Sequence, residues 1–195
     1  MERSPDDVAI PFPSRLVWGV KVPSKCKMLF WCTLLNRILT KDNLMHRGFQ
    51  VDLASSRLMD ESISHVFLHC PLALQLWHEL LHPRMHCFSL ILTADSVEEL
   101  LIAWPKGRGL HLGKRLWSLL PYSVIWILWR VRNERIFRAR MVSMERMVVE
   151  VKATLWFWVG YWPGRRFYCF QDLLLRWFEL LNGLLVRNVM NVGIA

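Results

Sequence analysis

One segment in the middle of the chain restricts the fold more than any other. Between Arg115 and Arg130 none of the 14 residues is charged, and most are apolar. A helix needs about 20 consecutive apolar residues to cross a bilayer, so this segment is too short for that role. A helix that is apolar on every side must instead be covered by other parts of the protein. The segment therefore predicts a buried central helix and no transmembrane segment.

The rest of the chain also favours helices. Hydrophobic residues make up 53% of the 195 positions, which suffices for a hydrophobic core and excludes a largely disordered chain. Start signals and apolar spacings of three and four residues predict helices over 23–38, 41–47, 71–81, 97–104, 111–138, 143–161 and 167–186. Only residues 16–22 are expected to be extended. The predicted fold class is mainly α, with a small helical domain followed by a long-helix C-terminal region.

Charge divides the chain into two parts. Residues 1–100 carry 10 basic and 11 acidic side chains, whereas residues 101–195 carry 15 and 5, so the net charge of +9 comes from the second part. Lys106-Gly107-Arg108-Gly109 lies at this change and is the clearest linker. The predicted organisation is a loose leader over 1–14, a helical domain over 15–104, a linker over 105–110 and a basic, aromatic-rich helical region over 111–195.

A cluster of arginines near the end of the predicted long helix is the candidate nucleic-acid site. It consists of Arg130, Arg132, Arg135, Arg138 and Arg140, opposed only by Glu134. Arginines neutralise phosphates, and nearby aromatic rings can stack on bases of RNA or DNA. A second interpretation is a solvated helix face that keeps an apolar protein soluble. The tryptophans of 153–162, followed by two arginines, also suit a membrane interface. These interpretations stay open at this stage.

The sequence indicates neither catalysis nor a disulfide framework. Its five cysteines are odd in number, are not closely paired and follow no secretory leader. We therefore expect a reducing, intracellular compartment, either nucleus or cytoplasm. No Ser/His/Asp set, Cys/His pair or glycine-rich phosphate loop stands out. The prediction is that the protein is not an enzyme.

His65 and Cys70 form the candidate metal site. Four residues separate them, a spacing found in the second half of Cys-Cys-His-Cys zinc sites. A closed structural zinc site needs four ligands. The preceding segment, 49–60, contains no cysteine and no histidine.

A series of short motifs runs in order through residues 15–82. The motifs are Val22-Pro23-Ser24-Lys25, Phe30-Trp31, Asn36-Arg37-Ile38-Leu39-Thr40, Asp42-Asn43-Leu44, Arg47-Gly48, Glu61-Ser62-Ile63-Ser64-His65-Val66-Phe67-Leu68-His69-Cys70-Pro71 and Leu76-Trp77. The series resembles the zinc-binding domain that follows the reverse transcriptase in plant LINE-type (non-LTR) retrotransposons. Residues 116–162 are similar, more loosely, to the continuation of such polypeptides.

The resemblance implies a zinc site in which this chain departs from the family pattern. A Cys-x-x-Cys is expected within 53–59, where this sequence reads Leu53-Ala54-Ser55-Ser56-Arg57-Leu58-Met59. Two of the four expected ligands are therefore absent, and the N-terminal domain is zinc-binding-like with a degenerate site. Zinc stays a candidate cofactor at His65 and Cys70, with His69 or Asp60 as third ligand. The favoured alternative is that Cys70 is a small buried hydrophobe and His65 a hydrogen-bonded residue that orders the loop.

Two functional hypotheses follow. The first is a non-catalytic remnant of a retrotransposon reverse-transcriptase zinc-binding domain with auxiliary nucleic-acid binding, since no Tyr-x-Asp-Asp of a polymerase active site occurs. Its expected partners are RNA or DNA and other parts of a retroelement polyprotein. The second is an α-helical protein-interaction module with no metal and no nucleic-acid role.

Overall fold

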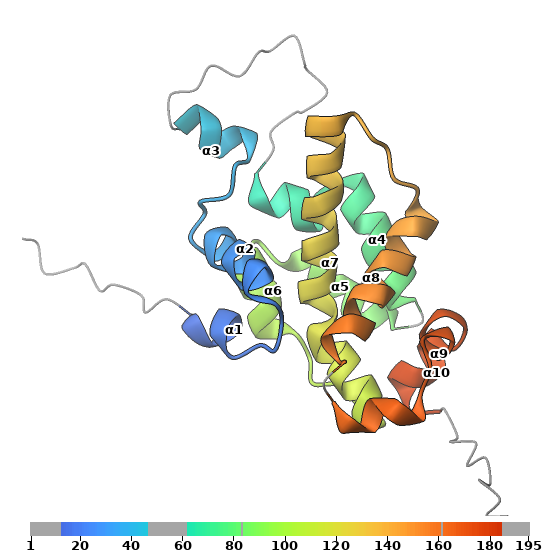
Figure 1. Ribbon diagram of the computed structural model, residues 1–195. Coiled ribbons are helices and arrows are strands. Elements are labelled where there is room, and N and C mark those ends of the chain that lie inside the picture. The colour runs from blue at the N-terminus through green and yellow to red at the C-terminus, as the bar shows by residue number, and fades with distance from the viewer. Residues whose placement is uncertain (1–12, 47–61, 83, 161, 185–195) are drawn as a thin grey trace, which may run out of the picture.

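The long helix α7 (His111–Arg138) forms the axis of the structure (Figure 1). The computed structural model describes residues 13–46, 62–82, 84–160 and 162–184. All regular elements in these ranges are helical, which confirms the mainly α prediction. Besides α7 they are α1 (Ser14–Trp18), α2 (Ser24–Leu34), α3 (Lys41–His46), the π-helix η2 (His65–His69), α4 (Pro71–Leu81), α5 (Met85–Thr93), α6 (Val97–Ala103), α8 (Met144–Trp158), the 3₁₀ helix η3 (Pro163–Phe167), α9 (Phe170–Leu175) and α10 (Trp177–Asn182).

The central turns of α7 are buried, as their composition predicts. Every residue from 119 to 125 is buried, and Leu120, Val124 and Ile125 have no exposed surface. Along its length, α7 is covered by α8, which folds back along it, and by α10, η2 and α4 (Figure 1). Burying one such aliphatic side chain contributes about 2 kcal/mol. Among the described residues, no helix is long and apolar enough to span a membrane.

Pro121 removes one backbone hydrogen bond from α7, and the indole of Trp104 supplies a replacement. Proline has no backbone N–H, so the carbonyl of Trp117, four residues earlier, loses its partner within the helix. The indole N–H of Trp104, just after α6, donates to that carbonyl at 3.0 Å. The two indole rings also stack, with centroids 4.9 Å apart. The proline therefore fixes where α6 ends against α7.

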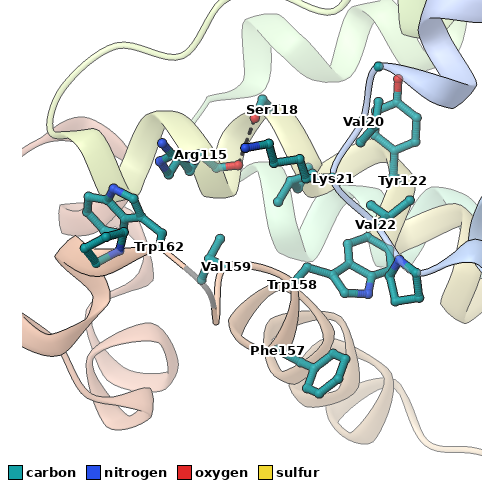
Figure 2. A pocket seen from close by; sticks show the side chains of 14 residues that line it. Val20, Lys21, Val22, Arg115, Ser118, Tyr122, Phe157, Trp158, Val159 and Trp162 are labelled. Atoms are coloured by element: carbon teal, nitrogen blue, oxygen red, sulfur yellow. Dashed lines mark hydrogen bonds between the residues drawn. The ribbon is translucent and has the colours of Figure 1, made fainter.

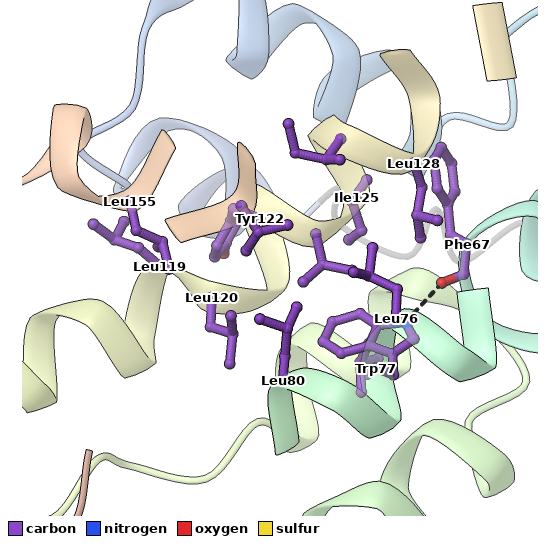
Figure 3. Packing of buried hydrophobic residues seen from close by; sticks show 14 of the residues in the cluster. Phe67, Leu76, Trp77, Leu80, Leu119, Leu120, Tyr122, Ile125, Leu128 and Leu155 are labelled. Atoms are coloured by element: carbon purple, nitrogen blue, oxygen red, sulfur yellow. Dashed lines mark hydrogen bonds between the residues drawn. The ribbon is translucent and has the colours of Figure 1, made fainter. Parts of the chain in front are cut away.

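Other buried aromatic side chains bind backbone carbonyls in the same way. The indole N–H of Trp77 donates to the carbonyl of Phe67 at 2.9 Å (Figure 3). Burial raises the pKa of Tyr122 to about 12, and its hydroxyl donates to the carbonyl of Leu16 at 2.9 Å. These bonds satisfy the polar atom of each buried ring. They connect η2 to α4 and α1 to α7.

The extended conformation expected for residues 16–22 is wrong. Residues 16–18 belong to α1, and residues 19–22 form no regular element. Leu16 donates its N–H to the carbonyl of Pro13 at 2.9 Å, and Val17 is fully buried. The described residues include no strand with which an extended segment could pair. A helical turn satisfies its own backbone groups, whereas a lone buried strand does not.

Most helix starts agree with the prediction, and the differences concern where helices end. Thr40, Ser96 and Ser143 accept a backbone N–H at 3.4, 3.1 and 3.3 Å and cap α3, α6 and α8. The first predicted helix, 23–38, stops at Leu34, because Asn36 adopts a left-handed φ of 52°. The helix α5 was not expected.

The tail forms separate short helices and not the single helix predicted over 167–186. A capping box at Cys169 and Asp172 starts α9, and Arg176, with φ −121°, separates it from α10. Gly183 ends α10 with φ 74°. Residues 185–186, most of the predicted leader and the segment 47–61 lie outside the described residues.

The bond from Trp104 to α7 gives a first prediction. Trp104→Phe keeps an aromatic ring but removes the N–H, so the free energy of unfolding in urea should fall by about 1 kcal/mol. In a Pro121→Ala background the backbone N–H of Ala supplies the missing donor, and the same substitution should cost clearly less. An equal cost in both backgrounds would show that the indole bond does not compensate for the proline.

Candidate functional site

Cys70 caps the helix α4. It has an extended backbone before Pro71, which occupies the first turn of the helix, where its missing N–H is harmless. The Sγ of Cys70 accepts the backbone N–H of Ala73 at 3.3 Å and lies 3.7 Å from the carbonyl of Val66, to which the thiol donates. The non-metal interpretation expected Cys70 to be a small buried hydrophobe; its side chain is instead partly buried and hydrogen-bonded to the backbone.

The two histidines of the motif lie on η2 in different environments. His65 is partly buried, and its backbone N–H donates to Ser62 Oγ at 3.0 Å. The Nε2 atom of His69 is buried without a hydrogen-bond partner among the described residues. Unpaired buried nitrogens of this kind are uncommon. His69 is therefore the side chain of this motif that has a buried polar atom without a hydrogen bond among the described residues.

The described residues do not fit a structural zinc site. They contain no group of three or more histidine, cysteine or acidic side chains that could hold a metal ion. Asp60 and the segment 53–59 lie outside the described residues. The hydrogen bonds of Cys70 Sγ described above join it to the backbone groups of Val66 and Ala73, not to the side chain of His65.

The arginine cluster of α7 is divided among three environments. Arg130 pairs with Glu150 of α8 at 3.0 Å. Arg132 turns toward the segment after α2, donates to the carbonyl of Leu39 at 3.0 Å and lies over the ring of Trp129. Only Arg138 and Arg140 lie together, at the end of the helix. Both are exposed, as is Arg135.

Glu134 holds those last arginines together. Arg138 lies 2.9 Å and Arg140 3.8 Å from its carboxylate. The approach of Arg140 depends on Ala139, which ends α7 with a left-handed φ of 50° and lets Arg140 donate its backbone N–H to the carbonyl of Glu134 at 3.2 Å. Nothing in the sequence signals this turn, because a left-handed conformation is rare for alanine.

The structure also forms a concavity that the sequence analysis did not anticipate. It has a volume of about 930 Å³ and lies between residues 19–23, the first half of α7 and the end of α8. Figure 2 shows Lys21 and Arg115 beside it, with Trp158 and Trp162 among its walls. These residues are far apart in sequence and share no motif. The one signal was the pairing of aromatic residues with arginines in 153–166.

The described part of the chain is mainly helical, with the His65–Cys70 motif just before α4 and arginines at the end of α7. Residues 4–77 match the family model described as zinc-binding in reverse transcriptase. The prediction of a reverse-transcriptase zinc-binding-like segment is thereby confirmed for this part of the chain. No curated protein and no solved structure matches.

The capping role of Cys70 predicts a different response to two substitutions. Cys70→Ala removes the cap and should lower the free energy of unfolding by about 1 kcal/mol. Cys70→Ser places a better capping oxygen at the same position and should retain or raise stability. Both are measured by urea unfolding of the purified full chain, with zinc content determined by elemental analysis. A wild type with one zinc per chain, and a serine variant as unstable as the alanine variant, would contradict the capping interpretation.

Proposed function

We propose that the protein is a non-catalytic auxiliary module that binds nucleic acid, related to the reverse-transcriptase zinc-binding domain of a plant LINE-type retrotransposon. The match of residues 4–77 supports the reverse-transcriptase context. The observation that carries the nucleic-acid part is the exposed group of Arg135, Arg138 and Arg140 around Phe137, called the α7 tip below.

The charge balance around the α7 tip favours a polyanion. Between residues 130 and 150 six arginines face three glutamates, a net charge of +3. The ion pairs of Arg138 and Arg140 share one carboxylate, and both arginines are well exposed. Exposed ion pairs contribute only about 0–1 kcal/mol, so phosphates can compete with Glu134 for these arginines. Phosphates of a nucleic acid can therefore take the place of Glu134.

Phe137 adds an aromatic surface to this charge. Its side chain is 75% exposed, in contrast to Trp126 and Trp129, which are partly buried against the core. An exposed ring between arginines can stack on an unpaired base, which contributes to binding without reading the sequence. We therefore expect the α7 tip to contact the phosphates and to stack on a base of the nucleic acid without sequence specificity.

A protein partner is the competing function for the same surface. The α7 tip has exposed apolar neighbours, Ile136 and Met141, beside its own Phe137. Apolar side chains beside arginines are also typical of protein interfaces. Other parts of a retroelement polyprotein are the partners that the resemblance suggests. Salt dependence separates the two functions, because release of counterions from phosphates makes nucleic-acid binding weaken steeply with salt.

The test compares two double variants of the full chain. Arg135→Gln with Arg138→Gln should weaken binding to a fluorescent single-stranded RNA and reduce the slope of log affinity against log salt by about 1.4. Lys106→Gln with Arg108→Gln removes the same charge from exposed residues before the other end of α7 and is the matched control. Absence of RNA and DNA binding by the wild type at low salt would overturn the proposal and favour the protein-interaction module.

A further inference from the structure

Three neighbouring concavities of the surface share residues of their walls, and together they are called the groove below. The central concavity, of about 930 Å³, shares Trp162 and Pro163 with a second of about 400 Å³ beside η3. It shares Phe157 and Trp158 with a third, of about 320 Å³, between α2, α7 and α8. The groove thus runs from η3, past the end of α8, to the first turn of α2.

Cations line the groove over its whole length. Arg165 and Arg166 lie at one end, Lys21 and Arg115 in the middle, and Lys25 and Arg130 at the other end. Among the described residues that line it, the only acidic side chain is Glu150, which is paired with Arg130 and Arg146. Most of these cations come from outside the arginine cluster of α7. The groove is therefore a basic surface in its own right.

Three of these cations lie over aromatic rings that also line the groove. The guanidinium of Arg165 lies 4.1 Å from the ring centroid of Trp156, that of Arg115 5.3 Å from Trp162, and the Lys25 ammonium 5.5 Å from Trp126. Such pairs offer either a ring or a guanidinium plane to a flat ligand. The repetition of the pair along the groove suits a ligand that is itself a repeat of a charge and a ring.

Phe157 marks the point at which two of the concavities meet. It belongs to the last turn of α8, and its side chain is 67% exposed (Figure 2). A large exposed apolar ring at the meeting point of two basic concavities contributes little to the core. It is placed where a flat ligand in the groove would contact it.

We propose that this groove, here called the α8 groove, binds one strand of unpaired RNA or DNA, with phosphates on its cations and a base stacked on Phe157. The proposal rests on the nucleic-acid binding proposed above and assigns it a second surface. A duplex does not fit this chemistry, because its bases are stacked inside and cannot reach a ring in a concave wall. An acidic peptide would satisfy the cations but has no ring at each charge.

The first test isolates the stacking contact. Phe157→Ala should weaken binding to a fluorescent oligo(dT) strand about tenfold. It should leave binding to an abasic strand of the same length unchanged, because that strand carries the phosphates without the bases. Ile102→Ala removes an equally exposed apolar side chain from α6 and is the matched control. Equal weakening on both strands, or none on oligo(dT), would overturn the stacking contact.

The second test isolates the charges of the groove from those of the α7 tip. Lys21→Gln with Arg115→Gln should weaken binding to both strands and reduce the salt slope by about 1.4. If these groove variants bind like the wild type while the Arg135→Gln, Arg138→Gln protein loses affinity, the groove proposal fails and the proposed function stands. If the wild type binds no strand at low salt, both fail. Equal affinity for oligo(dT) and for polyglutamate of the same charge would also overturn the groove proposal.

Discussion

The structure depends on the burial of a helix that has no polar face over its central turns. Because every residue of α7 from 119 to 125 is buried and most are apolar, the chain before and after it must supply cover on all sides. Along its length, α7 is covered by α8, α10, η2 and α4. Proline within such a helix would ordinarily leave a carbonyl unsatisfied in a dry interior, and Trp104 removes that cost. Surface features such as the α7 tip are therefore fixed to a rigid axis.

The sequence predicted those elements whose signals are local. The limits of α7, the start of α4 at Pro71 and the caps at Ser96 and Ser143 follow from spacing and capping chemistry within a few residues. The error at residues 16–22 has a different origin. Its β-branched residues favour a strand only if another strand is available, and the pattern of one segment cannot report that.

The candidate sites differ in the same way. Those that lie within one motif or one helix could be predicted, and those formed by distant segments could not. His65 and Cys70 were identifiable because they belong to one motif, and the arginines of α7 because they lie on one helix. The α8 groove was not identifiable, because Lys21, Arg115 and Phe157 come together only through packing of three distant segments. The gathering of Arg138 and Arg140 at Glu134 likewise depends on the left-handed Ala139, a backbone choice that alanine does not favour.

The thiol of Cys70 has a consequence for how sequences with this motif evolve. Its Sγ accepts the backbone N–H of Ala73 and so stabilises the start of α4 without any metal. A chain that has lost its other two zinc ligands still gains folding stability from this cysteine. A cysteine before this helix is therefore useful to folding whether or not a metal is bound.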